Sequence, residues 1–121
     1  MQKHDIYDRV TDFVVSVIKY SDKISKLFSG RIIAKQMIRS ASSIGANLHE
    51  ADGATTKKDF INKMGISRKE AQETRYWLDL LKKADLIKNH DNVLELDKLH
   101  KESDEISKIL SSIINRATKN Q

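Results

Sequence analysis

The chain of 121 residues contains no cysteine and no proline, and it has only 4 glycines. The absence of cysteine excludes a disulfide framework and any metal site built on thiolates. Proline breaks helices and glycine loosens them, so their scarcity favours long helices joined by short connections. Aromatic residues make up only 6% of the chain. If the protein binds nucleic acid, we therefore expect few stacked bases and mainly phosphate contacts.

The sequence also lacks any long apolar run. No stretch approaches the roughly 18 apolar residues that span a bilayer. The first ten residues, MQKHDIYDRV, lack the apolar segment of a signal peptide. We therefore expect a cytoplasmic protein that does not contact a membrane, and the absence of cysteine fits a reducing compartment.

What the chain does contain is abundant charge together with enough apolar residues for one core. Hydrophobic residues make up 39% of the chain and charged residues 32%, and the length is that of one domain. The net charge of +5 is uneven, because residues 19–39 carry a net +5 and residues 54–88 a net +4. Lysine and arginine attract phosphates whatever the base sequence, which suggests nucleic acid as a partner. A solvated, lysine-rich helix surface is the alternative.

Apolar residues recur at alternating spacings of four and three in four segments of the chain. These segments span about residues 4–28, 31–51, 56–87 and 95–117. The spacing places one apolar stripe along each of four helices. Helices of similar length joined by short loops predict an all-α, antiparallel up-down-up-down four-helix bundle that forms one domain over residues 1–121. The first stripe, for example, comprises Ile6, Val10, Phe13, Val17, Tyr20, Ile24 and Leu27.

Local signals predict where these helices begin and end. Ser29-Gly30 is expected to end the first helix, with the glycine in a left-handed conformation. Thr56 is a candidate N-cap for the third helix, with Asp59 three residues later in a capping-box position. Residues 89–92, Asn-His-Asp-Asn, are turn-prone and are expected to precede the fourth helix.

The second and third helices carry further lines of residues that a simple bundle does not need. On the second helix, polar residues spaced 4,4,3 lie roughly opposite the apolar stripe and among small residues, which allow close approach of another backbone. On the third, two acids share a line with the only tryptophan. We interpret these residues as a subunit interface or buried polar network in which Arg39 pairs with Glu70 or Glu73. The alternative is a polar stripe facing solvent. The residues concerned are Arg39, Ser43, Asn47, Glu50, Glu70, Glu73 and Trp77.

Signals for catalysis and for metal binding are weak. Asp97 and His100 have the i,i+3 spacing of half a di-iron site, but no second acid-x-x-His motif exists. His49-Glu50 lacks the second histidine of a zincin motif, and no nucleophile elbow or phosphate-binding glycine loop is present. We therefore expect neither a metal nor a cofactor, and no enzymatic activity.

Three stretches carry a resemblance to a known family: RSASSIGANLHEA at residues 39–51, KKDF at residues 57–60 and KEAQETRYWL at residues 69–78. The chain resembles the small bacterial four-helix-bundle proteins first noticed as reading frames in the intervening sequences of large-subunit ribosomal RNA genes. Family members usually read R-x-x-x-S-I-x-x-N-I-x-E-G in the second helix, where this chain has Gly45-Ala46 in place of Pro-Ser.

The resemblance implies a ring-like homopentamer. It also implies a relationship to an accessory protein of diversity-generating retroelements that binds nucleic acid and a reverse transcriptase. No biochemical activity is established for most members. By position the family's polar motif falls on residues that are not known to be catalytic, namely Arg39, Ser43, Asn47, Glu50, Glu70 and Glu73.

The sequence therefore predicts a non-enzymatic, homo-oligomeric binding protein that contacts RNA or a ribonucleoprotein mainly through phosphates. A protein-interaction scaffold without nucleic-acid binding is the first alternative, and a metal-binding bundle enzyme is the second. The candidate phosphate-binding residues come from the two basic segments and are Lys19, Lys23, Lys26, Arg31, Lys35, Lys57, Lys58, Lys63 and Arg68.

Overall fold

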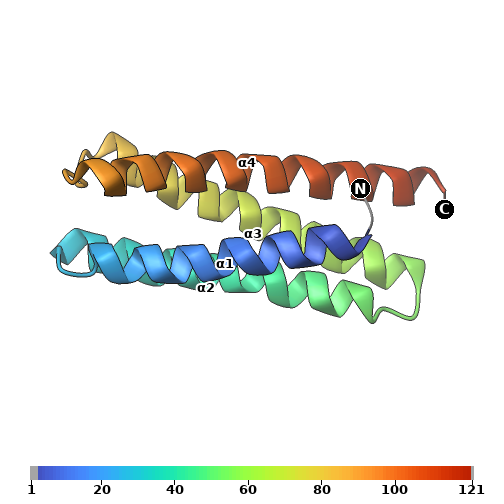
Figure 1. The fold of residues 1–121 in the computed structure, drawn as a ribbon. Coiled ribbons are helices and arrows are strands. Elements are labelled where there is room, and N and C mark those ends of the chain that lie inside the picture. Colours follow the sequence, from blue (N-terminus) through green and yellow to red (C-terminus); the bar gives the residue numbers. More distant parts are fainter. Residues whose placement is uncertain (1–2, 121) are drawn as a thin grey trace.

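The computed structural model describes residues 3–120, with side chains from residue 6 onward. It consists of four α-helices, and the described residues form no strand. Successive helices run in opposite directions (Figure 1), as in an up-down-up-down bundle. The predicted all-α four-helix bundle is therefore confirmed. The helices are α1 (Lys3–Ile24), α2 (Phe28–Asp52), α3 (Lys57–Lys83) and α4 (His90–Lys119).

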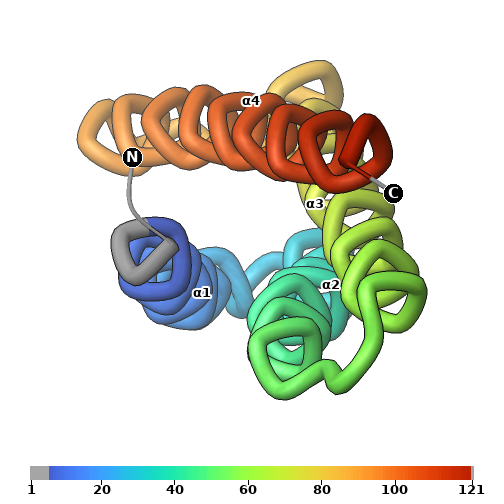
Figure 2. Tube along the Cα trace, turned by 90° about the vertical axis from the view of Figure 1, so that its right-hand side faces the viewer, coloured from blue at the N-terminus to red at the C-terminus, as the bar shows by residue number. Residues whose placement is uncertain are grey.

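Each helix packs against its neighbours in the chain, and α4 closes the ring against α1. The α2–α3 contact is the most extensive and the α1–α4 contact the least. Figure 2 shows the reason, because α3 slants from the side of α2 up to α4 while α1 and α4 lie farther apart. The start of α1 and the end of α4 lie at the same end of the bundle (Figure 1).

The core is built from the predicted apolar stripes. From Ile6 to Ile24 every stripe residue of α1 is at most 3% exposed. Leu27 is the exception at 44% exposed, since it follows the end of the helix. On α4 the alternating spacing of four and three continues from Leu110 to Ile113, but Ile113 is only half-buried and the buried position is Ile114. A heptad repeat assumes 3.5 residues per turn, whereas a straight α-helix has 3.6. Over the 30 residues of α4 this difference shifts the buried position by about one residue.

The connection between α1 and α2 differs from the prediction. Helix α1 ends at Ile24, and Gly30 lies inside the first turn of α2. Its φ is not positive, so it does not adopt the predicted left-handed conformation. Gly30 is required for a different reason. A Cβ atom there would collide with the carbonyl oxygen of Ile24. Glycine therefore allows the start of α2 to pack directly against the end of α1.

The predicted turn at residues 89–92 is instead the beginning of α4. Asn89 is the N-cap, and its side-chain oxygen accepts a hydrogen bond from the backbone N–H of Asn92 at 3.1 Å. Asparagine is favoured both in turns and at N-caps, so its presence did not distinguish them. The N-cap predicted at Thr56 is confirmed by its hydrogen bond from the Asp59 N–H at 3.1 Å.

Helix α3 ends at Lys83, four residues before the predicted end at residue 87. Asp85 has a φ of 53°, the left-handed conformation that turns the chain towards α4. Ile87 is still buried at 7% exposed although it lies outside the helix. An apolar residue that is buried just beyond the helix therefore continued the apolar pattern of the sequence, and the predicted helix was too long.

Candidate functional site

Arg39 of α2 and two glutamates of α3 form an ion-pair cluster on the outer side of these helices. The Nη1 atom of Arg39 lies 3.1 Å from the Glu70 carboxylate, and its Nη2 atom donates to Glu73. The same Glu73 oxygen accepts a hydrogen bond from the Trp77 indole at 3.0 Å. One guanidinium thus binds two carboxylates, and both contacts lie within a single chain.

Burial within the cluster is graded. The Glu70 side chain is only 12% exposed and that of Glu73 is 33% exposed, whereas that of Arg39 is 51% exposed. Trp77 is half-buried, and its ring meets that of Tyr76 edge to face with centroids 5.1 Å apart. A half-enclosed acid pair held by one exposed arginine is well suited to structural pairing. It offers no nucleophile and no metal set.

Not all of the predicted polar line joins this cluster. The Asn47 amide donates within α2, to the carbonyl and hydroxyl oxygens of Ser43 at 2.9 and 3.0 Å. Glu50 pairs instead with Lys63 of α3, at 3.2 Å. The predicted polar line therefore consists of three separate groups along α2: the Arg39 cluster, the Ser43–Asn47 pair and the Glu50–Lys63 ion pair. All three lie outside the core, which leaves them available to a neighbouring molecule.

Beneath the cluster, hydroxyl groups join α2 to α3. Ser40 and Thr74 share a hydrogen bond of 2.7 Å, and both residues are fully buried. The Ser67 hydroxyl donates to the carbonyl oxygen of Ile44 at 2.8 Å. A side chain as short as serine reaches a carbonyl of the next helix only when the two backbones are close. Of the small residues seen in the sequence of α2, Ser40 therefore serves this intramolecular contact, whereas Gly45 lies against Val10 and Val14 of α1.

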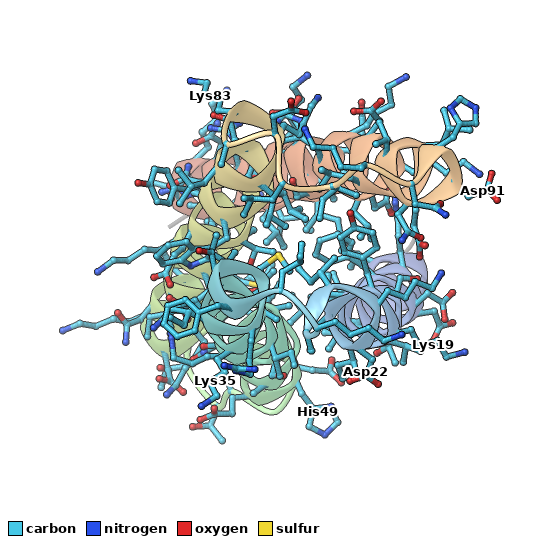
Figure 3. All side chains as sticks on the ribbon, turned by 90° about the vertical axis from the view of Figure 1, so that its left-hand side faces the viewer. Lys19, Asp22, Lys35, His49, Lys83 and Asp91 are labelled. Carbon is cyan, nitrogen blue, oxygen red and sulfur yellow. The ribbon has the colours of Figure 1, made fainter. Side chains whose placement is uncertain are left out.

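The candidate phosphate-binding residues divide between opposite ends of the bundle. Those of α1 and the start of α2 lie at the end that faces the viewer in Figure 3, where Lys19 and Lys35 point outward. Lys23 is neutralised by Glu95 at 2.7 Å. Four others make no ion pair with any described residue: Lys19, Lys26, Arg31 and Lys35. Asp22 and Asp91 also point outward at this end, so cations and acids are mixed there.

The second basic group lies towards the other end, on the first half of α3. Most of its side chains already have a hydrogen-bond or ion-pair partner within the chain. Lys57 donates to the carbonyl oxygen of Asn120 at 2.8 Å, and Lys63 pairs with Glu50. Arg68 reaches the Ser111 hydroxyl of α4 at 3.4 Å. Only Lys58 of this group has no partner among the residues with described side chains. The two basic segments thus form two separate surfaces, and the α1–α2 end has more cations without an ion-pair partner among the described residues.

Sequence reasoning missed the apolar residues beside those cations. Phe28 is 69% exposed, and Ile32 is 49% exposed on the same helix. Phe28 follows Leu27 directly, so in the sequence both appeared to belong to the end of a longer first helix. Only the break after Ile24 places Phe28 at the start of α2, and without proline the sequence gives no clear signal of that break.

The histidines with described side chains gather no metal set. His100 lies 3.7 Å from Asp79, whereas Asp97 pairs with Lys82 at 3.1 Å. His49 points outward at the edge of the bundle (Figure 3), and the side chain of His4 lies outside the described residues. No group of three or more histidine or acidic residues is close enough to hold a metal ion within residues 6–120. In the described part of the chain, no helix is both long and apolar enough to span a membrane.

Comparisons with known proteins agree with this architecture. The family model of the 23S rRNA-intervening sequence protein matches residues 2–112. The chain is also similar to a protein of unknown function from the S23 ribosomal protein family of Bacteroides thetaiotaomicron, solved by crystallography at 1.70 Å. The two are 36% identical, with a TM-score of 0.82 over 95% of this chain and 99% of that one. No curated protein matches. The chain belongs to the 23S rRNA-intervening sequence protein family.

Proposed function

We propose that this protein is a non-enzymatic, homo-oligomeric binding protein of the cytoplasm that contacts RNA or a ribonucleoprotein mainly through phosphates. The observation that carries the proposal is the set of unpaired cations at the α1–α2 end: Lys19, Lys26, Arg31 and Lys35. Exposed cations without an acidic partner are free to replace the counterions of a phosphate backbone. The connection of the family with ribosomal RNA genes supports the same ligand class.

The test is RNA binding as a function of salt. If the four cations each contact a phosphate of a single strand, the logarithm of affinity should fall with the logarithm of salt with a slope of about −3. Raising salt from about 50 to 200 mM should then weaken binding about 50-fold. Fluorescence anisotropy with a labelled RNA measures this, and absorbance at 260 nm of the purified protein reports RNA that it retains. An affinity that does not change with salt concentration, or no binding at low salt, contradicts the proposal.

The two ends of the bundle supply matched variants. Changing Lys19, Lys26, Arg31 and Lys35 to glutamine removes four positive charges from the α1–α2 end. Changing Lys57, Lys58, Lys63 and Arg68 removes the same charge from α3. We expect the first variant to lose most of the affinity and the second to lose much less, since three of its four side chains already have partners. Equal losses would indicate a general effect of net charge.

The Arg39 cluster is the proposed contact between subunits of a homo-oligomer, which we expect to be a pentamer. Its acids and the half-buried Trp77 give a polar and aromatic surface of the kind that interfaces favour. The variants Arg39→Glu and Glu73→Arg should each lower the molar mass measured by light scattering, while circular dichroism verifies the fold. If neither substitution changes the association state, the interface lies elsewhere.

A protein-interaction scaffold is the second candidate. It is favoured by exposed apolar side chains outside the Arg39 cluster, such as Leu94 at 49% and Val15 at 44% exposure. This function predicts the same oligomer but no nucleic acid in the purified sample. Chromatography with light scattering and absorbance at 260 nm distinguishes the two candidates in one measurement.

A further inference from the structure

The first two turns of α2 present an exposed face that combines apolar and cationic side chains. Phe28, Arg31, Ile32 and Lys35 follow one another at i, i+3, i+4 and i+7, which is one face of a helix. Phe28 is the most exposed large hydrophobic residue of the described chain, at 69%. We call this face, together with the preceding Lys26 and Leu27, the Phe28 platform.

Within the platform, the aromatic ring and the cations are arranged together. The Arg31 guanidinium lies over the Phe28 ring, 5.7 Å from its centroid, within cation–π range. Lys26 and Lys35 flank the ring along the chain, and none of the three cations pairs with a described acid. The platform thus offers an exposed π surface and three charges for anionic groups on either side of it.

The platform is also held firmly in place. The Leu27 N–H donates to the carbonyl oxygen of Ile24 at 3.3 Å, and the Arg31 N–H donates to that of Leu27 at 2.8 Å. Gly30 packs so closely on the Ile24 carbonyl that no Cβ atom fits between them. The position of Phe28 is therefore set by backbone contacts, so a ligand that stacks on the ring need not order a flexible loop.

We infer that the Phe28 platform binds one unpaired nucleobase of a single-stranded RNA, stacked on the ring, with neighbouring phosphates held by Lys26, Arg31 and Lys35. The inference rests on the proposed function and specifies its ligand class. Bases within a duplex are already stacked on each other and cannot reach a lone ring, whereas bases of a single strand can. One stacked base per subunit is also consistent with the few aromatic residues of the chain.

The order of residues on the platform favours RNA over a lipid surface. Arg31 lies between Phe28 and Ile32 on the same face, so inserting both into hydrocarbon would carry the guanidinium with them. A charged side chain is costly at membrane depth. For a stacked base the same guanidinium is favourable, because it covers one face of the Phe28 ring and can reach a phosphate of a strand whose base stacks on the other face.

The experiment compares the full-length protein with three variants by fluorescence anisotropy at about 50 mM salt. The probes are a labelled 12-nucleotide oligouridine and a duplex RNA of the same length. We expect Phe28→Ala to weaken single-strand binding about 5- to 100-fold and to leave duplex binding unchanged. Phe28→Trp should retain or tighten single-strand binding. Tyr76→Ala, which removes another exposed ring, should match the wild type.

The outcomes separate this inference from the proposed function. If Phe28→Ala binds oligouridine as the wild type does while binding remains salt-dependent, base stacking is wrong and phosphate binding stands. If the wild type binds neither RNA at low salt, both are wrong. A third measurement uses vesicles that contain phosphatidylserine. Phe28-dependent vesicle binding without a preference for single-stranded RNA would overturn the inference, because the platform would then be a lipid-binding surface.

Discussion

Inside the bundle, the polar side chains that join α2 to α3 are short, whereas those that join α1 to α4 are long. Ser40 bonds to Thr74 and Ser67 bonds to a backbone carbonyl of α2. Across the other contact the Tyr20 hydroxyl donates to the Asn92 carbonyl oxygen at 3.1 Å, and Arg9 forms two bonds of 2.7 Å with Glu102. Long side chains are needed there because α1 and α4 lie farther apart than α2 and α3 (Figure 2).

This difference indicates which kind of change should weaken each contact. Buried hydroxyl bonds between close backbones leave no room for added volume, but they are shielded from salt and pH. Long ionic and phenolic side chains tolerate changes in spacing, yet their contribution depends on the charge state and on screening. The α2–α3 contact should therefore fail by steric overpacking, and the α1–α4 contact by titration or salt.

The largest effect is expected from overpacking the α2–α3 contact. Ala71 is fully buried on the face of α3 between Ser67 and Thr74. Ala71→Leu should lower the free energy of unfolding by about 3 kcal/mol, because the backbones must separate to accept the side chain. Urea unfolding followed by circular dichroism measures it. Ala46→Leu, at an exposed position of α2, is the control and should change little. Equal stability of both variants would show that the contact is not tight.

The next effect is alkaline weakening of the α1–α4 contact. Burial, followed by the charges of Glu95 and Asp97, raises the pKa of Tyr20 from its ordinary value of 10.0 to about 12. Between these values the unfolded chain loses the phenolic proton while the folded chain keeps it. The free energy of unfolding should therefore fall by about 2 kcal/mol as pH rises from 10 to 12.

The variant Tyr20→Phe isolates this contribution. At neutral pH it should be about 1 kcal/mol less stable, since the Asn92 carbonyl loses its donor. Its stability should then fall less steeply above pH 10 than that of the wild type. Parallel pH profiles would mean that the pKa of Tyr20 is not raised.

The smallest effect is expected at the Arg9–Glu102 pair. Both side chains are about one-third exposed, at 32% and 31%, so the pair is partly screened. Arg9→Lys keeps the charge but cannot form the two parallel bonds. It should cost about 0.5 kcal/mol, and the difference should shrink in high salt. Thermal unfolding at two salt concentrations measures this, and a difference that salt leaves unchanged would indicate lost packing.

The sequence predicted the regular parts of this molecule well, because helix period and burial follow from the same spacing. The pairing of Arg39 with an acid of α3 was also expected, although not that one guanidinium would take both Glu70 and Glu73. What could not be predicted depends on contacts between segments. Gly30 looked like a helix end, since its collision with the Ile24 carbonyl exists only once the two helices are folded together. The exposed Phe28 followed from that same unpredicted break.

The placement of the chain ends has a practical consequence. The first residues of α1 and the last residues of α4 lie at one end of the bundle, and the α1–α2 connection lies at the opposite end (Figure 1). Helix α1 has 22 residues, which at 1.5 Å per residue is roughly 33 Å. A protein tethered to a sensor surface or to a fluorescent partner through either end would therefore display Phe28 and its cations outward to the solution.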